Sequence, residues 1–273
     1  MRIRKENAVA TIEYMKMIRE RYSRLGYPSY QWFYAEEPPA WTPLEKPLSK
    51  SRVGFLCTAG TYVKGQVAYY YKDDTSIRAI PKDTNVSNIR FSHLTEQYLP
   101  AARKDPNCVF PIEPLRRLEK EGVVGEIAQD MLSCMGAVYS QRRTREELVP
   151  KVVASFQAQG VDIAFLVPLW PVCHQTVCLI ARHLEAIGIP TLCMGSALDI
   201  MQAGNPPRGV FTDYPLGHST GMPHDPSDQY TMTRAGLEAF ETIKEPGTIL
   251  KLDRTWTINA NWKADTLDDT KGD

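Results

Sequence analysis

Short apolar runs alternate with amphipathic segments from Arg52 onward, and this pattern predicts most of the secondary structure. Strands are expected at 53–58, 89–92, 161–167, 190–194, 209–212 and 248–252. Helices are expected at 113–121, from a Thr144–Glu147 capping box onward, at 172–187, and from Asp225-Pro226 to about 243. Strands that alternate with helices indicate βαβ units. We therefore predict an α/β fold with a doubly wound, mainly parallel sheet and helices on both faces.

The first fifty residues follow a different pattern. Residues 11–24 have the apolar spacing of an amphipathic helix, whereas 27–47 are rich in proline and aromatic residues. The prolines exclude a long helix, and so many aromatic side chains are normally packed against something. We predict an N-terminal helix and extended arm over residues 1–50, lying on the main domain or on a partner subunit. Residues 51–273 are predicted to form a single α/β catalytic domain, with a polar tail after Lys263 that frays.

Charge and composition exclude several functional classes. The chain has 32 Lys+Arg and 32 Asp+Glu, and this balance argues against a nucleic-acid binder or a polybasic membrane anchor. Its apolar runs are too short to span a bilayer. The charged N-terminus does not resemble a signal peptide, so we expect a cytoplasmic protein. The six cysteines are then expected to be thiols.

Cysteines gather at one predicted edge of the sheet. One strand ends in Cys57, a second leads through Trp170 into Cys173, and a third ends in Cys193. In parallel sheets, ligands bind beyond the carboxyl ends of the strands. Cys173 falls at a predicted helix start, where backbone N–H groups favour a thiolate. We predict a thiol site with Cys57, Cys173 and Cys178 as candidate nucleophiles, and with the adjacent His174. Cys108, Cys134 and Cys193 are expected in the core.

Other motifs extend or restrict this site. The cysteine and histidine spacings do not match a zinc site, so we predict no metal. The motifs for binding nucleotide or flavin cofactors are absent, so no such cofactor is expected. Glu113 is a candidate acid or base, or a helix-start carboxylate. Arginines commonly hold a substrate carboxylate. The predicted substrate-binding residues are Arg78, His93, Arg142, Arg143, Trp170, His218 and Ser219.

Several segments together resemble a known family. FLVPLWPVCHQTVC at 165–178, TSIRAIP at 75–81, FSH at 91–93, GVVGE at 122–126 and residues 213–221 are similar to the glycine/sarcosine/betaine/D-proline reductase selenoprotein B family, and most similar to its D-proline reductase branch. The resemblance covers about 52–252 and implies reductive C–N cleavage with a dithiol reductant and a separate pyruvoyl-bearing subunit that activates the amino group. It also implies a selenocysteine at the position of Trp170, with Cys173 as its partner thiol.

Trp170 leaves several hypotheses open. If the codon for residue 170 is UGA, which encodes selenocysteine, and has been read as tryptophan, the family reaction would be unchanged. A native Trp170 would stack on a ring substrate while the thiols carry the chemistry. Our preferred hypothesis is hydrolytic C–S or C–N cleavage of a small cyclic amino-acid-like carboxylate, as in a desulfhydrase that releases sulfide from a cyclic thioamide or thiourea. The alternatives are the family's reductive cleavage and a non-catalytic subunit that docks a partner, or a second copy, through its arm.

Overall fold

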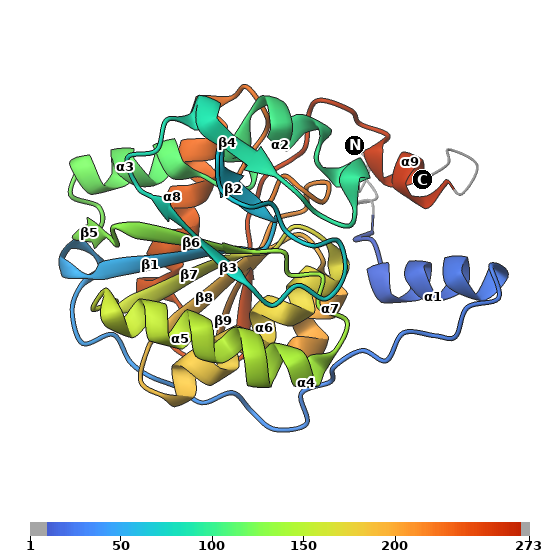
Figure 1. Ribbon diagram of the computed structural model, residues 1–273, viewed down its shortest axis with the longest axis horizontal. Coiled ribbons are helices and arrows are strands. Elements are labelled where there is room, and N and C mark those ends of the chain that lie inside the picture. The colour runs from blue at the N-terminus through green and yellow to red at the C-terminus, as the bar shows by residue number, and fades with distance from the viewer. Residues whose placement is uncertain (1–9, 269–273) are drawn as a thin grey trace, which may run out of the picture.

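The computed structural model describes residues 10–268 and is built around one twisted sheet (Figure 1). The strand order is β10-β9-β8-β7-β1-β6-β3, and β5 also pairs with β1. The strands are β1 (Arg52–Cys57), β3 (Ile77–Pro81), β5 (Glu126–Ile127), β6 (Asp130–Cys134), β7 (Ile163–Val167), β8 (Thr191–Gly195), β9 (Arg208–Phe211) and β10 (Thr248–Lys251). Of their pairings, that of β3 with β6 is antiparallel and the others are parallel. The predicted mainly parallel sheet is confirmed.

Helices cover both faces of the sheet (Figure 1). Helices α3 (Ile112–Lys120) and α8 (Pro226–Thr242) lie on one face, and α5 (Val149–Ala158) and α6 (Pro171–Ala186) lie on the other. Side chains of β1 alternate between the two layers, because Phe55 joins one hydrophobic cluster and Leu56 the other. The shorter helices are α1 (Tyr14–Arg24), α2 (Pro100–Lys104), α4 (Gln141–Arg143), α7 (Leu198–Gly204) and α9 (Trp262–Leu267). In the described part of the chain, no helix is both long and apolar enough to cross a membrane.

The helical segment after Tyr139 begins earlier than predicted. Ser140 is the N-cap, and its Oγ accepts a hydrogen bond from the backbone N–H of Arg143 at 3.2 Å. Thr144 is therefore already inside the segment, in a π-helical turn over Thr144–Leu148, and the predicted Thr144 cap is wrong. Pro150 lies inside this continuous helical segment, two residues after the π-helical turn ends, and not at a helix start.

Three other parts of the chain differ from the prediction. Residues 89–92 contain a strand, β4 (Ile89–Phe91), but it pairs with β2 (Thr61–Val63) in a separate antiparallel sheet. The patterning did not predict β3 or β6, which extend the main sheet beyond β1. The tail does not fray directly after Lys263, because α9 continues to Leu267, and residues 269–273 lie outside the described residues.

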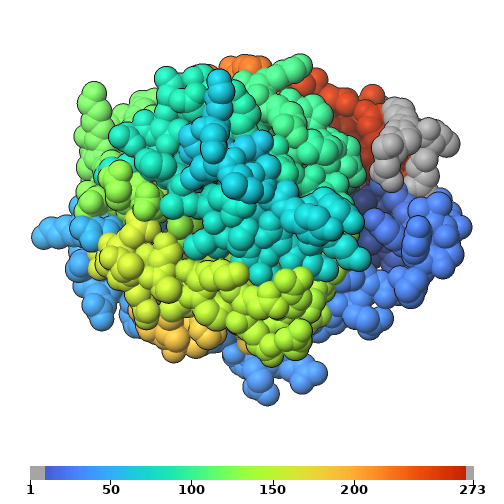
Figure 2. Space-filling model, viewed as in Figure 1, coloured from blue at the N-terminus to red at the C-terminus, as the bar shows by residue number. Residues whose placement is uncertain are grey.

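The N-terminal arm packs on the chain's own α6. Residues 25–47 are almost entirely irregular and, in Figure 2, the blue N-terminal segment lies along the right and lower margins of the molecule. Three side chains of α6 bind its backbone: Gln175 Oε1 accepts from Phe33 N (2.7 Å), Arg182 Nη2 donates to Glu37 O (2.8 Å), and Glu185 Oε1 accepts from Thr42 N (2.7 Å). The arm thus covers the main domain, as expected. The proposed boundary at residue 50 and any role of the arm in oligomers stay predictions.

A buried ion pair lies beneath the arm. Glu185 and Arg208 are fully buried, and Glu185 Oε1 lies 2.8 Å from Arg208 Nη1. The second carboxylate oxygen accepts from Thr191 N at 2.7 Å. Arg208 Nη2 donates to Thr42 O at 2.8 Å, and the guanidinium lies 3.7 Å from the ring centroid of Trp41. The arm therefore supplies part of the environment that satisfies two buried charges.

Candidate active site

The thiol of Cys173 lies where the carboxyl ends of three parallel strands meet. Strand β1 has β6 on one side and β7 on the other, so the chain changes direction across the sheet at this point. Thr58 follows β1, Met135 follows β6, and α6 begins at Pro171 after β7, with Cys173 as its third residue. Ligands of doubly wound sheets bind at such switch points. The topology therefore places the predicted thiol where the fold class favours a site.

Polar atoms from three segments surround the Cys173 sulfur. Sγ lies 3.3 Å from His93 Nε2, 3.4 Å from the carbonyl oxygen of Thr58 and 3.8 Å from that of Met135. Cys173 is fully buried. Gly136 allows this close approach, because it has φ +69° and an added Cβ would lie 3.0 Å from Sγ and 2.3 Å from the Cβ of Thr58.

His93 presents a proton to this sulfur. Its Nδ1 accepts a hydrogen bond from the backbone N–H of Thr95 at 3.1 Å, so Nδ1 carries no proton in the neutral ring. Burial lowers the pKa of His93 to about 3, which keeps the ring neutral at pH 7. The ring proton therefore lies on Nε2, which faces both Cys173 Sγ and the backbone of Met135. His93 acts here as a hydrogen-bond donor that favours a thiolate, and Thr95 fixes the tautomer.

Burial and hydrogen bonding have opposite effects on the thiol of Cys173. Burial is the larger effect and raises its pKa to about 11. The side chain of Thr58 and backbone groups of Leu169 and Trp170 act in the opposite direction. With a pKa near 11, about one thiol in 10⁴ is ionised at pH 7. Cys173 is therefore protonated at neutral pH, and a reaction of its thiolate requires a proton acceptor or a nearby positive charge.

The raised pKa predicts how Cys173 responds to alkylation. Because its thiolate fraction is small, carboxamidomethylation of this residue by iodoacetamide is expected to rise about tenfold per pH unit between pH 7 and 9.5. Peptide mass spectrometry of the native chain measures the rate, with circular dichroism to verify that the chain stays folded. A rate that is flat across this range would contradict the assignment.

His174 has a different environment from His93. Its Nδ1 lies 2.8 Å from the carbonyl oxygen of Trp170, and its Nε2 accepts from the backbone N–H groups of Ser196 (2.9 Å) and Ala197 (3.1 Å). Burial lowers the pKa of His174 to about 4. Both ring nitrogens are thus engaged with backbone. His174 ties the start of α6 to the loop after β8, and so positions the segment that carries Cys173.

The other two candidate thiols are placed differently. Cys57 belongs to the same buried cluster as Cys173 and donates from Sγ to Val109 O at 3.4 Å. Burial, with a smaller contribution from the neighbouring Cys173, raises the pKa of Cys57 to about 12. Cys178 packs instead against Cys193 and Gly204. The structure therefore brings Cys57 and Cys173 into one cluster and places Cys178 in different contacts.

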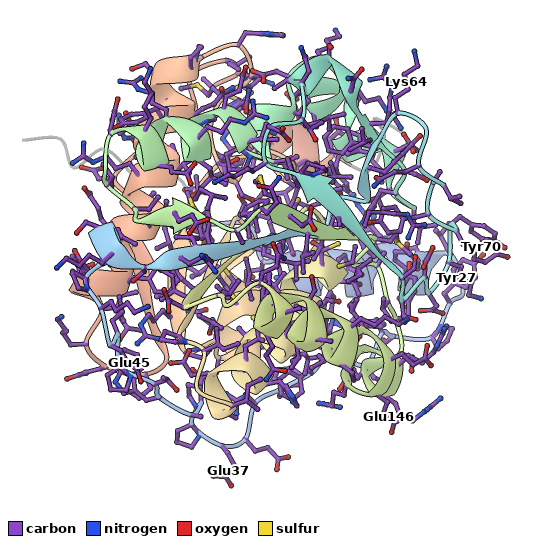
Figure 3. The ribbon with its side chains drawn as sticks, turned by 60° about the vertical axis from the view of Figure 1, so that its left-hand side comes forward. Tyr27, Glu37, Glu45, Lys64, Tyr70 and Glu146 are labelled. Atoms are coloured by element: carbon purple, nitrogen blue, oxygen red, sulfur yellow. The ribbon has the colours of Figure 1, made fainter. Side chains whose placement is uncertain are left out.

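A large pocket lies on the other side of Trp170. It has a volume of about 600 Å³ and is bounded by α1, the arm and the beginning of α6. Its aromatic side chains are Tyr22, Tyr27, Tyr30, Trp32, Tyr139 and Trp170, and we call it the aromatic pocket. The Trp170 ring lies 6.4 Å from that of His93 and 5.9 Å from that of Tyr139, centroid to centroid. Trp170 is thus the wall between the pocket and the buried thiol. Figure 3 shows Tyr27 at the surface.

The predicted polar residues do not line this pocket. Glu113 is exposed at the start of α3 and accepts from Asn107 Nδ2 at 2.6 Å. His218 Nδ1 lies 3.2 Å from Leu216 O, and its ring is 4.8 Å from that of Trp256. Ser219 is nearer the site, because its Oγ donates to Pro168 O at 3.3 Å in the loop that leads to Trp170.

The three predicted arginines bind other parts of the protein. Arg78 donates to Val67 O at 2.8 Å and lies over the Tyr69 ring. Arg142 and Arg143 form ion pairs with Glu146 and Glu147, one helical turn along the chain. None of the three is among the residues that line the aromatic pocket. They do not form a carboxylate clamp there, although their role as substrate ligands elsewhere stays a prediction.

Sequence reasoning missed Thr95, Tyr30 and Tyr139. Thr95 follows His93 by two residues, a spacing that often produces a side-chain hydrogen bond, and this was a usable signal. Tyr139 follows β6, which the patterning did not predict. Within residues 10–268, no cluster of three His, Cys, Asp or Glu side chains could hold a metal ion.

Comparisons with known proteins identify relatives. Residues 82–168 match the family model described as glycine/sarcosine/betaine reductase selenoprotein B. The chain is 31% identical to the D-proline reductase subunit gamma of Acetoanaerobium sticklandii over 79% of this chain and 88% of that protein.

More distant relatives belong to related complexes. The chain is 27% identical to the glycine reductase complex component B subunit gamma of Peptoclostridium acidaminophilum over 55% of this chain, and 24% identical to the betaine reductase complex component B subunit beta of that organism over 56%. It aligns with only 35% of the length of the first and 36% of the length of the second. No solved structure matches. The identity and coverage shared with the D-proline reductase subunit show that this chain belongs to the glycine/sarcosine/betaine/D-proline reductase selenoprotein B family.

Proposed function

We propose that the chain is the thiol-bearing subunit of a reductase of the selenoprotein B type, with Cys173 as the attacking sulfur. The observation that carries this proposal is the pairing of Cys173 Sγ with His93 Nε2 at the switch point of the sheet, 3.3 Å apart. A sulfur beside an imidazole at a helix start is an arrangement that reactive cysteines share, and because burial keeps Cys173 protonated, this proposal requires that the substrate complex supplies a proton acceptor. The relatives are components of reductase complexes, and this favours reduction over hydrolysis.

The proposed reaction uses two thiols and an external dithiol. The Cys173 thiolate attacks the substrate carbon that bears nitrogen, so that a C–S bond forms while the C–N bond breaks and the amine leaves with a proton. The Cys57 thiolate then attacks the sulfur of Cys173. The carbon leaves and takes a proton, and a Cys57–Cys173 disulfide remains. A dithiol reduces this disulfide and supplies the two electrons. In this proposal a pyruvoyl group on a separate partner subunit activates the substrate amino group.

Residue 170 bears on the identity of the attacking atom. An indole is not a nucleophile of this kind, so the chain with Trp170 depends on its cysteines. Intact-protein mass spectrometry of the chain purified from its natural source distinguishes tryptophan from selenocysteine at this position. Selenium in the chain would transfer the attacking role to residue 170 and return Cys173 to the role of partner thiol.

One observation favours a second candidate, a non-catalytic assembly subunit. Cys173 is fully buried behind the indole of Trp170. The sulfur is closed to a substrate in this structure, so the proposed reaction requires movement of the side chains that cover it. A chain that has lost the reaction would keep the fold, the arm and the docking surface. Hydrolytic release of sulfide, our preferred hypothesis from the sequence, receives no support from the relatives and becomes the third hypothesis.

A turnover assay separates the three functions. The purified chain is incubated with cyclic amino acids, including D-proline, and with cyclic thioureas, with and without dithiothreitol and a pyruvoyl-bearing partner subunit. We expect ring-opened amine that appears only with the dithiol and the partner. Sulfide formed without dithiol would instead establish the hydrolytic reaction. Absence of any product, together with co-purification of a partner, would identify an assembly subunit.

A further inference from the structure

The aromatic pocket has an unusual composition. Its walls combine six aromatic side chains with Ile18, Pro28 and Val172, and its polar groups are the hydroxyls and amides of Ser29, Gln31, Gln141 and the tyrosines. No ionised side chain is among the residues that line it. A volume of about 600 Å³ is typical of sites for small molecules. The pocket is therefore a candidate small-molecule binding site with aromatic, uncharged walls.

The pocket lacks what a carboxylate ligand needs. A carboxylate that leaves water requires a cation or several N–H donors in compensation. The two arginines that directly follow the lining residue Gln141 are already engaged, because Arg142 and Arg143 are paired with Glu146 and Glu147. An anion in this pocket would therefore lose its hydration without gaining a cation or N–H donors in compensation. The pocket selects against the carboxylate that amino-acid ligands carry.

The same walls favour a cation. Aromatic rings present electron-rich faces, and organic cations bind to such faces. Of the rings, Trp170 and Tyr139 are at the inner end, while Tyr27 is 61% exposed at the rim. The carboxylate of Asp73 lies beside the pocket, where it accepts from Tyr139 N at 2.7 Å. Burial is the main reason that the pKa of Tyr30 and of Tyr139 is raised, and the Asp73 carboxylate adds a smaller contribution in the same direction.

We propose that the aromatic pocket binds an organic cation that carries no carboxylate. This inference goes beyond the proposed function, because the cyclic amino acids of the turnover assay carry a carboxylate, and the cation is therefore a second ligand that binds beside Trp170. Binding itself is measured without turnover. The site can therefore bind a cation even if the reductase proposal fails, and turnover can be found even if the cation does not bind.

Three pyridines of nearly equal shape test the proposal. 1-Methylnicotinamide is a permanent cation, nicotinamide is neutral and nicotinate is an anion, and each is titrated into the full chain by calorimetry at pH 7.5. We expect the cation to bind about 3- to 30-fold more tightly than nicotinamide, and nicotinate to bind more weakly than both. Equal affinities, tighter binding of nicotinate, or no binding of the cation at 10 mM would overturn the proposal.

Variants locate the binding site. Trp170→Leu and Tyr27→Leu are each expected to remove most of the preference for the cation over nicotinamide. Tyr34→Leu is the matched control, because Tyr34 is an equally exposed aromatic residue of the arm that does not line the pocket. Tyr27 is at the rim, so its replacement provides the test even if Trp170→Leu does not fold. An unchanged preference in Tyr27→Leu, or a loss in Tyr34→Leu, would contradict the assignment.

Discussion

Cys173→Ser is expected to lower kcat/KM of the reductive reaction by at least about 10³-fold. A serine hydroxyl keeps the hydrogen bond to Thr58 O, but it ionises far less readily than a thiol and is a much weaker nucleophile at neutral pH. His93 Nε2–H, which faces the sulfur, stabilises a thiolate and does not remove a proton from an alcohol. The measurement is the initial rate with saturating dithiol and partner subunit.

Cys178→Ala is the matched control for this experiment. Cys178 is on the same helix as Cys173 and is equally buried, but it contacts Cys193 and Gly204. We expect its rate to stay within a few-fold of the parent chain. Full activity of Cys173→Ser, or a loss in Cys178→Ala as large as that in Cys173→Ser, would contradict the assignment of the attacking sulfur.

Glu185→Ala is expected to lower the free energy of unfolding by about 3–5 kcal/mol, because it leaves the guanidinium of Arg208 buried without a counter-ion. The backbone N–H groups of Thr42 and Thr191 also lose their acceptor. Urea unfolding measures the change. We further expect the arm to detach, so that endoproteinase Glu-C cleaves after the exposed Glu45 faster than in the parent chain.

An exposed ion pair provides the control for this change. Glu238 pairs with Arg234 at 2.7 Å, and both side chains are 46% exposed. Glu238→Ala is expected to change the free energy of unfolding by at most about 0.5 kcal/mol. The double variant Glu185→Leu/Arg208→Met is expected to recover much of the loss, because it leaves no unpaired charge. A small effect of Glu185→Ala would show that water reaches this pair.

The sequence predicted the position of Cys173 in the fold. Apolar runs ended at Cys57 and Val167, and Cys173 does lie beyond the carboxyl end of a strand, where the rule for ligand sites expects it, while its role in a site stays a prediction. The pairing of Cys173 with His93 could not be predicted, because His93 follows β4, a strand of the separate small sheet whose position depends on tertiary packing.

Other errors have identifiable physical causes. Strand β6 has the sequence DMLSC, which is too short and too mixed to show a period, so Tyr139 was not connected to the site. The ion pairs of Arg142 and Arg143 were also missed, although the glutamates four residues later already indicated them, and the role of both arginines as substrate ligands stays a prediction. His174 and His93 have similar sequence surroundings, and only their different hydrogen-bond partners distinguish them.

The docking of the arm on α6 has a consequence for synthesis of the chain. The arm is made first, but its hydrogen-bonding partners Gln175 and Glu185 are more than 140 residues further along. The central strand β1 likewise pairs with β6 and β7, which are synthesised later. Contacts of such long sequence separation form late and slow folding. On the ribosome the nascent chain must therefore carry an unburied, tyrosine- and tryptophan-rich segment until α6 emerges, and this interval is when it most needs a chaperone.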